Sequence, residues 1–266
     1  MSAGGTPPQA GGAPTRPRGT VPLTPDVCPS WLRPLVDNVG QIPEALRRRL
    51  PPDVLEMLTT ARGAASEREA AVLVLFSGPE FGPADGGFPD EADLLLTVRA
   101  SSLRHHAGQA AFPGGASDPP DDGPVGTALR EAREETGIDV SRLHPLVTME
   151  RTFIAPSQFE VVPVLAYSPD PGPVAVVNRA ETAIVSRVPV RAFINPDNRL
   201  MVYRGDLGQR WAGPAFLLNQ MLVWGFTGQV ISAVLDVAGW AQPWDTTDLR
   251  ELDEAMKLVG EHGGAR

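Results

Sequence analysis

Apolar runs of strand length alternate along the chain with loops that are rich in glycine and proline. Residues 70–76 (AAVLVLF) and 93–99 (DLLLTVR) are predicted strands, and a Gly/Pro-rich loop over residues 79–91 separates them. Further β-like runs are predicted over residues 109–112, 146–154, 160–167 and 183–190. Because these runs surround one well-defined helix, they fit a mixed α/β sandwich.

The predicted helix covers residues 128–135 (ALREAREE) and has two contrasting faces. An α-helix turns about 100° per residue, so positions i, i+3 and i+4 share a face. Three carboxylates occupy such positions, and three apolar residues lie on nearly the opposite side: Glu131, Glu134 and Glu135 against Val125, Leu129 and Ala132. Gly137 follows the last turn, where a left-handed residue is expected to end the helix.

The clustering of three carboxylates requires an explanation, because like charges at this spacing destabilise a helix by about 0.2–0.5 kcal/mol per pair. One interpretation is a solvated face that is relieved by Arg130 and Arg133. The other is a divalent cation, since Mg²⁺ prefers carboxylate oxygens and bridges the phosphate oxygens of substrates. The turn Pro113-Gly114-Gly115 precedes the helix, and glycine lets main-chain groups approach a ligand closely. Together these features favour a metal site formed by a loop and a helix.

The last third of the chain contains a long apolar stretch over residues 215–240. Its length raises the alternative of a transmembrane helix. Asn219, Gln220, Gln229 and Asp236 interrupt the stretch, so a buried amphipathic helix is favoured. Residues 248–259 (DLRELDEAMKLV) predict a final helix with Asp248 as its cap, packed on the domain or on a second subunit.

The two ends of the chain differ in composition from the middle, which divides the chain into four parts. Residues 1–29 are rich in proline and glycine and are expected to be disordered, with a proline-dependent docking segment as the alternative. Residues 30–65 predict a helical appendage, whose arginines at 47–49 either face solvent as partners of a helix dipole or bind phosphate. Residues 66–242 form the predicted main domain, and residues 243–266 the C-terminal helix and tail.

Composition limits the classes of partner. The formal net charge is −9 over 266 residues, which argues against binding to nucleic acid or to an anionic membrane. Local arginines and bound metal must therefore attract any anionic substrate. Cys28 is the only cysteine, so an intrachain disulfide is excluded. The first residues lack the apolar core of a signal peptide, and a cytoplasmic location is expected.

The segment from Gly115 to Ile138 resembles the Nudix box, usually written G-x5-E-x7-R-E-U-x-E-E-x-G-U, where U is a bulky aliphatic residue. Residues 130–138 (REAREETGI) match its second half, with only Ala132 small for a U position. The first half departs from the pattern. It has one residue more before Arg130, and Asp121 or Asp122 replaces the first glutamate.

A second motif lies directly upstream. Residues 95–115 (LLTVRASSLRHHAGQAAFPGG) are similar to the pattern LLTxR(S/A)x3Rx3Gx3FPGG, which accompanies the box in the coenzyme A pyrophosphatases of the Nudix superfamily. That subfamily also carries the longer loop with aspartates. The two linked motifs identify the chain as a member of it, in the actinobacterial form with an N-terminal extension.

The resemblance implies the Nudix fold, of class α/β (α+β), with a mixed β-sheet between helices. It also implies Mg²⁺-dependent hydrolysis of coenzyme A or acyl-coenzyme A to 3′,5′-ADP and 4′-phosphopantetheine or its acyl form. Glu131, Glu134 and Glu135 would be catalytic and would hold Mg²⁺, for which Mn²⁺ can substitute, with the Gly115 carbonyl and Glu181 as further ligands. One of the four glutamates would be the general base. The implied substrate-binding residues are Arg99, Arg104, His106, Gln109, Phe112 and Gly114.

Several alternatives stay open at this level. Glu181 is either a metal ligand or an acid at a helix N-terminus, Arg99 either binds phosphate or forms a structural ion pair, and His106 either acts in catalysis or makes a structural hydrogen bond. The substrate could also be another nucleoside diphosphate derivative, such as ADP-ribose, NADH or a nucleotide sugar. The altered box also allows a non-catalytic binding module. A homodimer is the expected alternative to a monomer.

Overall fold

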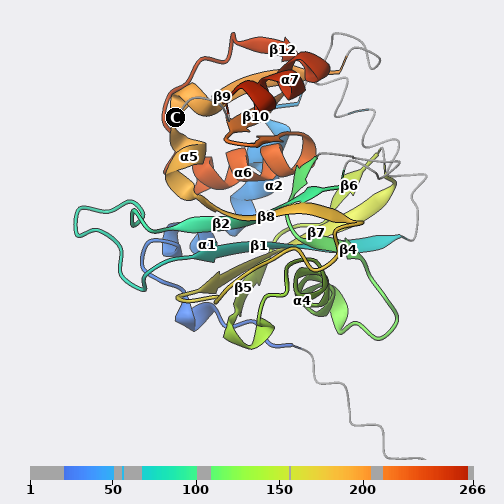
Figure 1. Cartoon of the computed structure of the whole chain (residues 1–266). Coiled ribbons are helices and arrows are strands. Elements are labelled where there is room, and N and C mark those ends of the chain that lie inside the picture. Colours follow the sequence, from blue (N-terminus) through green and yellow to red (C-terminus); the bar gives the residue numbers. More distant parts are fainter. Residues whose placement is uncertain are drawn as a thin grey trace, which may run out of the picture.

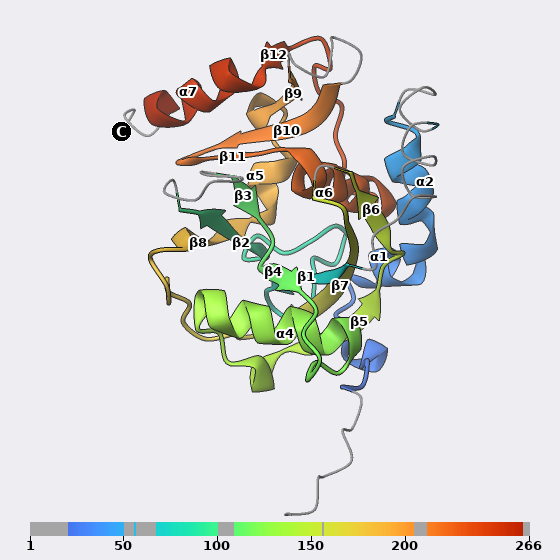
Figure 2. The ribbon, with the colours of Figure 1, turned by 90° about the vertical axis from the view of Figure 1, so that its right-hand side faces the viewer.

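The computed structural model describes residues 21–50, 56, 68–100, 109–155, 157–204 and 212–262. Two sheets and the helices packed on them make up the fold (Figures 1 and 2). This architecture confirms the predicted mixed α/β class.

The larger sheet is mixed, because β1 (Glu69–Ser77) pairs in parallel with β7 (Phe159–Ser168), while its other strands pair antiparallel. The central order is β3-β2-β1-β7-β5, formed by β3 (Ala110–Ala111), β2 (Asp93–Arg99) and β5 (His144–Thr148) beside β1 and β7. Three strands branch from this path. They are β4 (Gly114–Ala116) on β1, β6 (Thr152–Ile154) on β7, and β8 (Thr182–Pro189) on β2.

Helix α4 (Gly123–Thr136) covers one face of this sheet. Its apolar side, with Val125, Ala128 and Ala132, packs on Leu73 and Leu95 of the strands, and this contact fixes the direction of the opposite, acidic side. The helix ends at Gly137 in the left-handed conformation, as predicted. The short helix η3 (Val140–Arg142) then leads into β5.

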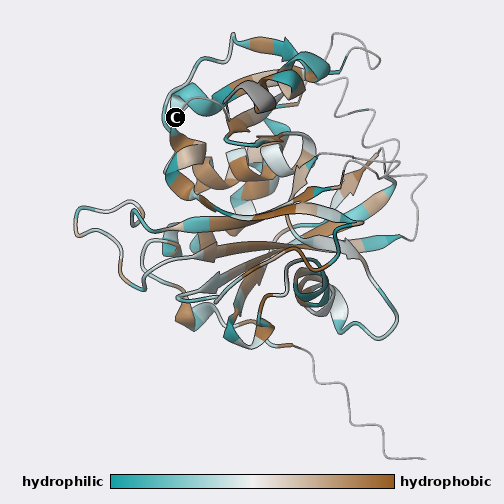
Figure 3. Ribbon diagram, in the orientation of Figure 1, coloured by the Kyte–Doolittle hydropathy of each residue, from teal (hydrophilic) through white to brown (hydrophobic). Residues whose placement is uncertain are grey.

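The other face is covered by α5 (Val190–Ile194), α6 (Gly225–Val237) and the N-terminal segment. That segment contains η1 (Pro25–Val27), α1 (Arg33–Asp37), η2 (Val39–Gln41) and α2 (Ile42–Arg47). In Figure 3 the hydrophobic colour gathers on the central strands and on α5 and α6 between the two sheets. The predicted helix after Pro52 lies outside the described residues, except for Glu56.

The second sheet has the order β11-β10-β9-β12, and the sequence analysis did not predict it. Its strands are β9 (Arg199–Tyr203), which follows η4 (Pro196–Asn198), β10 (Ala212–Leu218), β11 (Met221–Val223) and β12 (Leu249–Glu251). Helix α6 lies on one face and α7 (Leu252–His262) on the other, as both views show (Figures 1 and 2).

The prediction of one buried helix over residues 215–240 is therefore wrong in its first half. A two-residue turn at Asn219 and Gln220 joins β10 to β11, and Gln220 has a positive φ of 82°. Phe216 and Leu218 face α6 whereas Leu217 faces α7, so the strand is apolar on both faces and shows no alternation. Within the described residues, the structure holds no helix with the length and apolarity needed to span a bilayer.

The last helix also begins later than predicted. Asp248 does not cap it but pairs through two hydrogen bonds with Arg250 in β12. The Glu251 carboxylate accepts the main-chain N–H of Asp253 and takes the capping position. Leu252 and Ala255 of α7 pack on the second sheet of the same chain.

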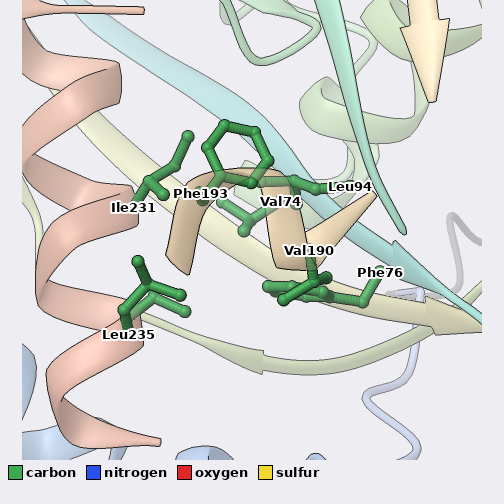
Figure 4. Close-up of a pocket in the computed structure, with 8 residues that line it drawn as sticks. Val74, Phe76, Leu94, Val190, Phe193, Ile231 and Leu235 are labelled. Atoms are coloured by element: carbon green, nitrogen blue, oxygen red, sulfur yellow. The ribbon is translucent and has the colours of Figure 1, made fainter. Parts of the chain in front are cut away.

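Figure 4 shows a small apolar cavity between the larger sheet and helices α5 and α6. Val74, Leu94, Phe193 and Ile231 are among its eight lining side chains, all of them apolar. The cavity offers no group that could bind or activate a phosphate, so the functional site lies elsewhere.

Candidate active site

The site begins where β1 and β2 diverge. These strands pair with each other only at Phe76–Leu94 and Ser77–Asp93, and beyond that point the segment carrying β3 and β4 lies between them. The Leu73 N–H donates to the Pro113 carbonyl at 2.8 Å, and the Arg99 N–H donates to the Gln109 carbonyl at 3.1 Å. The segment is thus held by main-chain hydrogen bonds on both sides.

The two glycines of this segment are required by close contacts. A Cβ atom on Gly114 would lie 2.5 Å from the carbonyl oxygen of Ala71 in β1. A Cβ atom on Gly115 would lie 2.5 Å from Oε1 of Glu131. Real Cβ atoms do not approach so closely, so only glycine lets the Glu131 carboxylate lie against the main chain of this segment.

Arg130 holds the loop that precedes α4. Its Nε and Nη2 donate to the two oxygens of Asp121 at 2.8 and 2.9 Å, and Nη2 also donates to the Ala116 carbonyl at 2.9 Å. The Asp121 side chain is only 5% exposed, and the paired guanidinium holds its pKa well below the usual range despite the burial. Of the two aspartates in this part of the loop, Asp121 is therefore the one that binds Arg130.

Thr127 completes this network, and the sequence analysis missed it. Its hydroxyl lies 2.9 Å from Asp121 Oδ2 and 3.1 Å from Ser117 Oγ. Thr127 follows Asp121 by six residues, across the start of the helix, so no periodic pattern indicates the contact.

The three predicted glutamates differ in exposure and in partners. Glu131 Oε1 and Glu134 Oε2 accept from Arg130 Nη1 at 2.8 and 3.2 Å, and the Glu134 side chain is 53% exposed. Burial raises the pKa of Glu131. Burial, aided by the negative charge of Glu131, raises the pKa of Glu135 to about 7, although the Arg99 charge and the Gly114 N–H oppose this rise.

Arg99 and Glu181 belong to the same site. Both influence the pKa of Glu135, Arg99 by lowering it and the exposed Glu181 by raising it. The end of β2 places them together, since the Ala100 N–H donates to the Glu181 carbonyl at 2.8 Å. Among the described residues, two polar atoms of this site are buried without a hydrogen-bond partner, Oε2 of Glu135 and Nε of Arg99. Glu181 precedes β8 rather than a helix, so it is not an acid at a helix N-terminus.

The described residues contain no group of three or more acidic, histidine or cysteine side chains already gathered as a metal site. Arg130 explains this, because it binds the carboxylates of both Glu131 and Glu134. The donors nevertheless suit a hard divalent cation, which takes carboxylate oxygens, and Oε2 of Glu135 is a buried acceptor that lacks a donor. The residues therefore fit a divalent metal ion.

The remaining predicted residues fall into two groups. Arg104 and His106 lie outside the described residues. Phe112 is only 3% exposed and packs in the core with α6, and its role in substrate binding stays a prediction. Gln109 lies at the edge of the site, where its amide nitrogen would be 3.3 Å from a Cβ atom on Gly225, the first residue of α6.

Comparison with known proteins identifies the family of the chain. Residues 81–204 match the family model described as NUDIX domain. The chain is 35% identical over 138 residues to the uncharacterized Nudix hydrolase NudL of Photorhabdus laumondii, covering 52% of this chain and 73% of that protein. It is 34% identical over 171 residues to the NudL protein of Yersinia pestis strain Pestoides F, covering 63% and 78% respectively.

Solved structures show similarity over a smaller part of the chain. The Nudix hydrolase RenU from M. smegmatis is 27% identical, covers 46% of this chain and 71% of its own, and has a TM-score of 0.36. Coverage of more than two thirds of the NudL proteins at over 30% identity establishes the family. The chain therefore belongs to the Nudix hydrolases and is a pyrophosphohydrolase of nucleoside diphosphate derivatives.

Proposed function

We propose that this enzyme hydrolyses the diphosphate bond of coenzyme A or acyl-coenzyme A. Water adds to one phosphorus, the bond from that phosphorus to the bridging oxygen breaks, and the products are 3′,5′-ADP and 4′-phosphopantetheine or its acyl form. A cytoplasmic location and a homodimer belong to the same proposal.

The observation that carries the proposal is the unsatisfied Nε of Arg99 close to Glu135, whose pKa the Arg99 charge lowers. Arg99 belongs to the motif shared with coenzyme A pyrophosphatases, and its buried Nε has no hydrogen-bond partner in the described structure. A buried N–H donor without an acceptor is unfavourable, so a phosphate oxygen that accepts from Arg99 Nε would stabilise the complex. Arg99 also lies beside the acidic face of α4, where the diphosphate must bind to react.

The acidic residues would hold the metal. Glu131, Glu134 and Glu135 would bind Mg²⁺, with Glu181 and the Gly115 carbonyl as additional ligands. Bound Mg²⁺ neutralises phosphate charge and polarises water. Burial raises the pKa of Glu135 to about 7 in the metal-free protein, but coordination to Mg²⁺ would lower its basicity, so the general base would be one of Glu131, Glu134, Glu135 and Glu181.

The substrate proposal is tested with a panel of diphosphates. Purified protein with Mg²⁺ should convert coenzyme A to 3′,5′-ADP, detected by mass spectrometry, about tenfold faster than it hydrolyses ADP-ribose or NADH. Arg99→Lys keeps the charge but loses the guanidinium fork, and should raise KM for coenzyme A more than it lowers kcat. Faster turnover of ADP-ribose or NADH would assign the enzyme to another substrate class.

A further inference from the structure

The loop between β7 and β8 ends beside the acidic face of α4 and is attached there at two points. The Val177 N–H donates to the carbonyl of Glu135, near the end of α4, at 3.4 Å. Four residues later, the Glu181 carbonyl accepts from the N–H of Ala100, directly after β2, at 2.8 Å. Residues 178–180 therefore pass from the helix to the strand along the edge of the site.

This short connection is a hydrogen-bonded turn. Asn178 Oδ1 accepts the Ala180 N–H at 3.0 Å, and the Asn178 carbonyl accepts the Glu181 N–H at 3.1 Å. Such bonds from an asparagine to the main chain that follows it fix a turn. The main chain of Arg179 is thus held on both sides, two residues before Glu181, whose charge acts on Glu135.

The Arg179 side chain is exposed, and over the described ranges of the chain it forms no hydrogen bond, ion pair or ring contact. The other described arginines of the site differ from it. Arg130 is bound by Asp121 and by two glutamates of α4, and Arg99 is partly buried. Arg179 therefore offers its guanidinium to a ligand without first breaking a contact.

A substrate with two separate phosphate groups needs a cation for each. In coenzyme A the ribose separates the diphosphate from the 3′-phosphate. Bound Mg²⁺ would neutralise the diphosphate, but the acidic side chains around the metal would repel a second phosphate, and the formal net charge of −9 adds no attraction. A guanidinium at the edge of the site suits this group, because it can donate to two phosphate oxygens at once.

We propose that Arg179 binds the 3′-phosphate of coenzyme A and so determines the preference for this substrate over diphosphates that lack the group. This inference rests on the function proposed above. Because the turn holds Arg179 and Glu181 on the same edge of the site, one substrate can reach both the metal ligands and the guanidinium. The 3′-phosphate does not react, so Arg179 contributes to affinity and not to the chemical step.

The test compares coenzyme A with 3′-dephospho-coenzyme A, which lacks only this phosphate. With Mg²⁺, the unsubstituted enzyme should have about tenfold higher kcat/KM for coenzyme A. Arg179→Ala should lower kcat/KM for coenzyme A about tenfold, mainly by raising KM, and that for the dephospho compound less than about twofold. Arg179→Lys should keep part of the preference, because lysine retains the charge but not the two parallel donors.

Arg133→Ala is the matched control. Arg133 is also exposed and, within the part of the chain that the structure describes, also without an ion pair. It follows Glu131 by two residues, about 200° around α4, and therefore points away from the site. Its substitution should leave the ratio of the two kcat/KM values unchanged. Thermal denaturation should give similar Tm values for all variants, since both side chains are exposed.

The outcomes separate this inference from the proposed function. An equal loss of kcat/KM with both compounds in Arg179→Ala, no loss with coenzyme A, or no preference in the unsubstituted enzyme would overturn the role of Arg179 and leave the proposed hydrolysis in place. Hydrolysis of neither compound would instead refute the proposed function, and this role of Arg179 with it.

Discussion

At the scale of single residues, the departure from the Nudix box is compensated within the loop itself. Asp121 reaches Arg130 in this longer loop, and both of its carboxylate oxygens accept from the guanidinium. Arg130 also binds Ala116, Glu131 and Glu134, so one side chain connects the glycine segment to the acidic face of α4. The altered first half of the motif therefore retains the contacts that position the glutamates.

Substitution of Asp121 should disrupt this hydrogen-bond network, whereas substitution of the neighbouring Asp122 should not. Asp121→Asn leaves Arg130 partly buried without its bidentate partner and should lower the free energy of unfolding by about 3 kcal/mol. Turnover should also fall, because Arg130, which binds Glu131 and Glu134, is no longer held in place by Asp121. Asp122→Asn is the matched control and should change stability by about 0.5 kcal/mol or less. Equal effects of the two substitutions in chemical denaturation would contradict this assignment.

Glu135 should make the metal-free enzyme less stable as pH rises. Its pKa of about 7 lies above the ordinary value of 4.5, so between these values the folded chain binds more protons than the unfolded chain. Stability is therefore lost as pH rises from about 4.5 through 7, and Glu135→Gln removes the cause. In a metal chelator at pH 8 the variant should gain on the order of 2 kcal/mol, with no gain at pH 4. If the Tm difference between the unsubstituted protein and Glu135→Gln does not vary with pH, burial does not raise the pKa of Glu135.

At the scale of elements, the strand fork and helix α4 together create the site. The sequence places the glutamates on one face of the helix, but the separation of β1 from β2 brings Gly115, Arg99 and Glu181 toward that face. Helix α6, on the opposite face of the larger sheet, is also closely packed against a strand. It approaches β10 so closely that a Cβ atom on Gly228 would lie 2.7 Å from the Pro214 carbonyl.

Gly228→Ala should therefore be destabilising although alanine favours helices. The steric overlap with Pro214 should cost about 1–3 kcal/mol, more than the roughly 1 kcal/mol gained in helix propensity. Gly40→Ala, where a Cβ atom would meet nothing within 4 Å, is the control and should be close to neutral. Equilibrium denaturation of both variants measures the difference, and a more stable Gly228→Ala protein would show that α6 can move away from β10.

At the scale of the whole molecule, the N-terminal segment packs as part of the central core. Trp31 is 3% exposed, and its ring lies about 6 Å from those of Phe76, Tyr167 and Trp240. Arg49, two residues after the end of α2, forms an ion pair with Asp236 of α6, so it binds protein rather than phosphate. The segment and the sheet share one hydrophobic cluster and should unfold together.

Truncating Trp31 should consequently destabilise the entire chain. Trp31→Ala should lower the free energy of unfolding by about 3–5 kcal/mol while leaving a single cooperative transition. Phe81→Ala, at a residue that is 80% exposed, should change the free energy of unfolding by about 0.5 kcal/mol or less. The transitions are followed by circular dichroism and by tryptophan fluorescence. Two separated transitions for the Trp31 variant would mean that the N-terminal segment folds on its own.

The sequence by itself determined the acidic helix, its glycine stop, the paired motifs and the central strands. Each of these is encoded by local spacing: three glutamates at i, i+3 and i+4, a glycine free to adopt positive φ, or a continuous apolar run. Each of these signals depends on residues close together in the chain, and here the tertiary structure agrees with them.

Only the tertiary structure decided the second sheet and the composition of the site. A strand buried on both faces and a buried helix have the same apolar composition, so residues 215–223 could not be assigned from their pattern. Contacts between residues far apart in the chain decide which aspartate binds Arg130. Such contacts also bury Phe112 in the core. Side-chain direction at a strand fork follows from pairing register, and register is set by the packed neighbours.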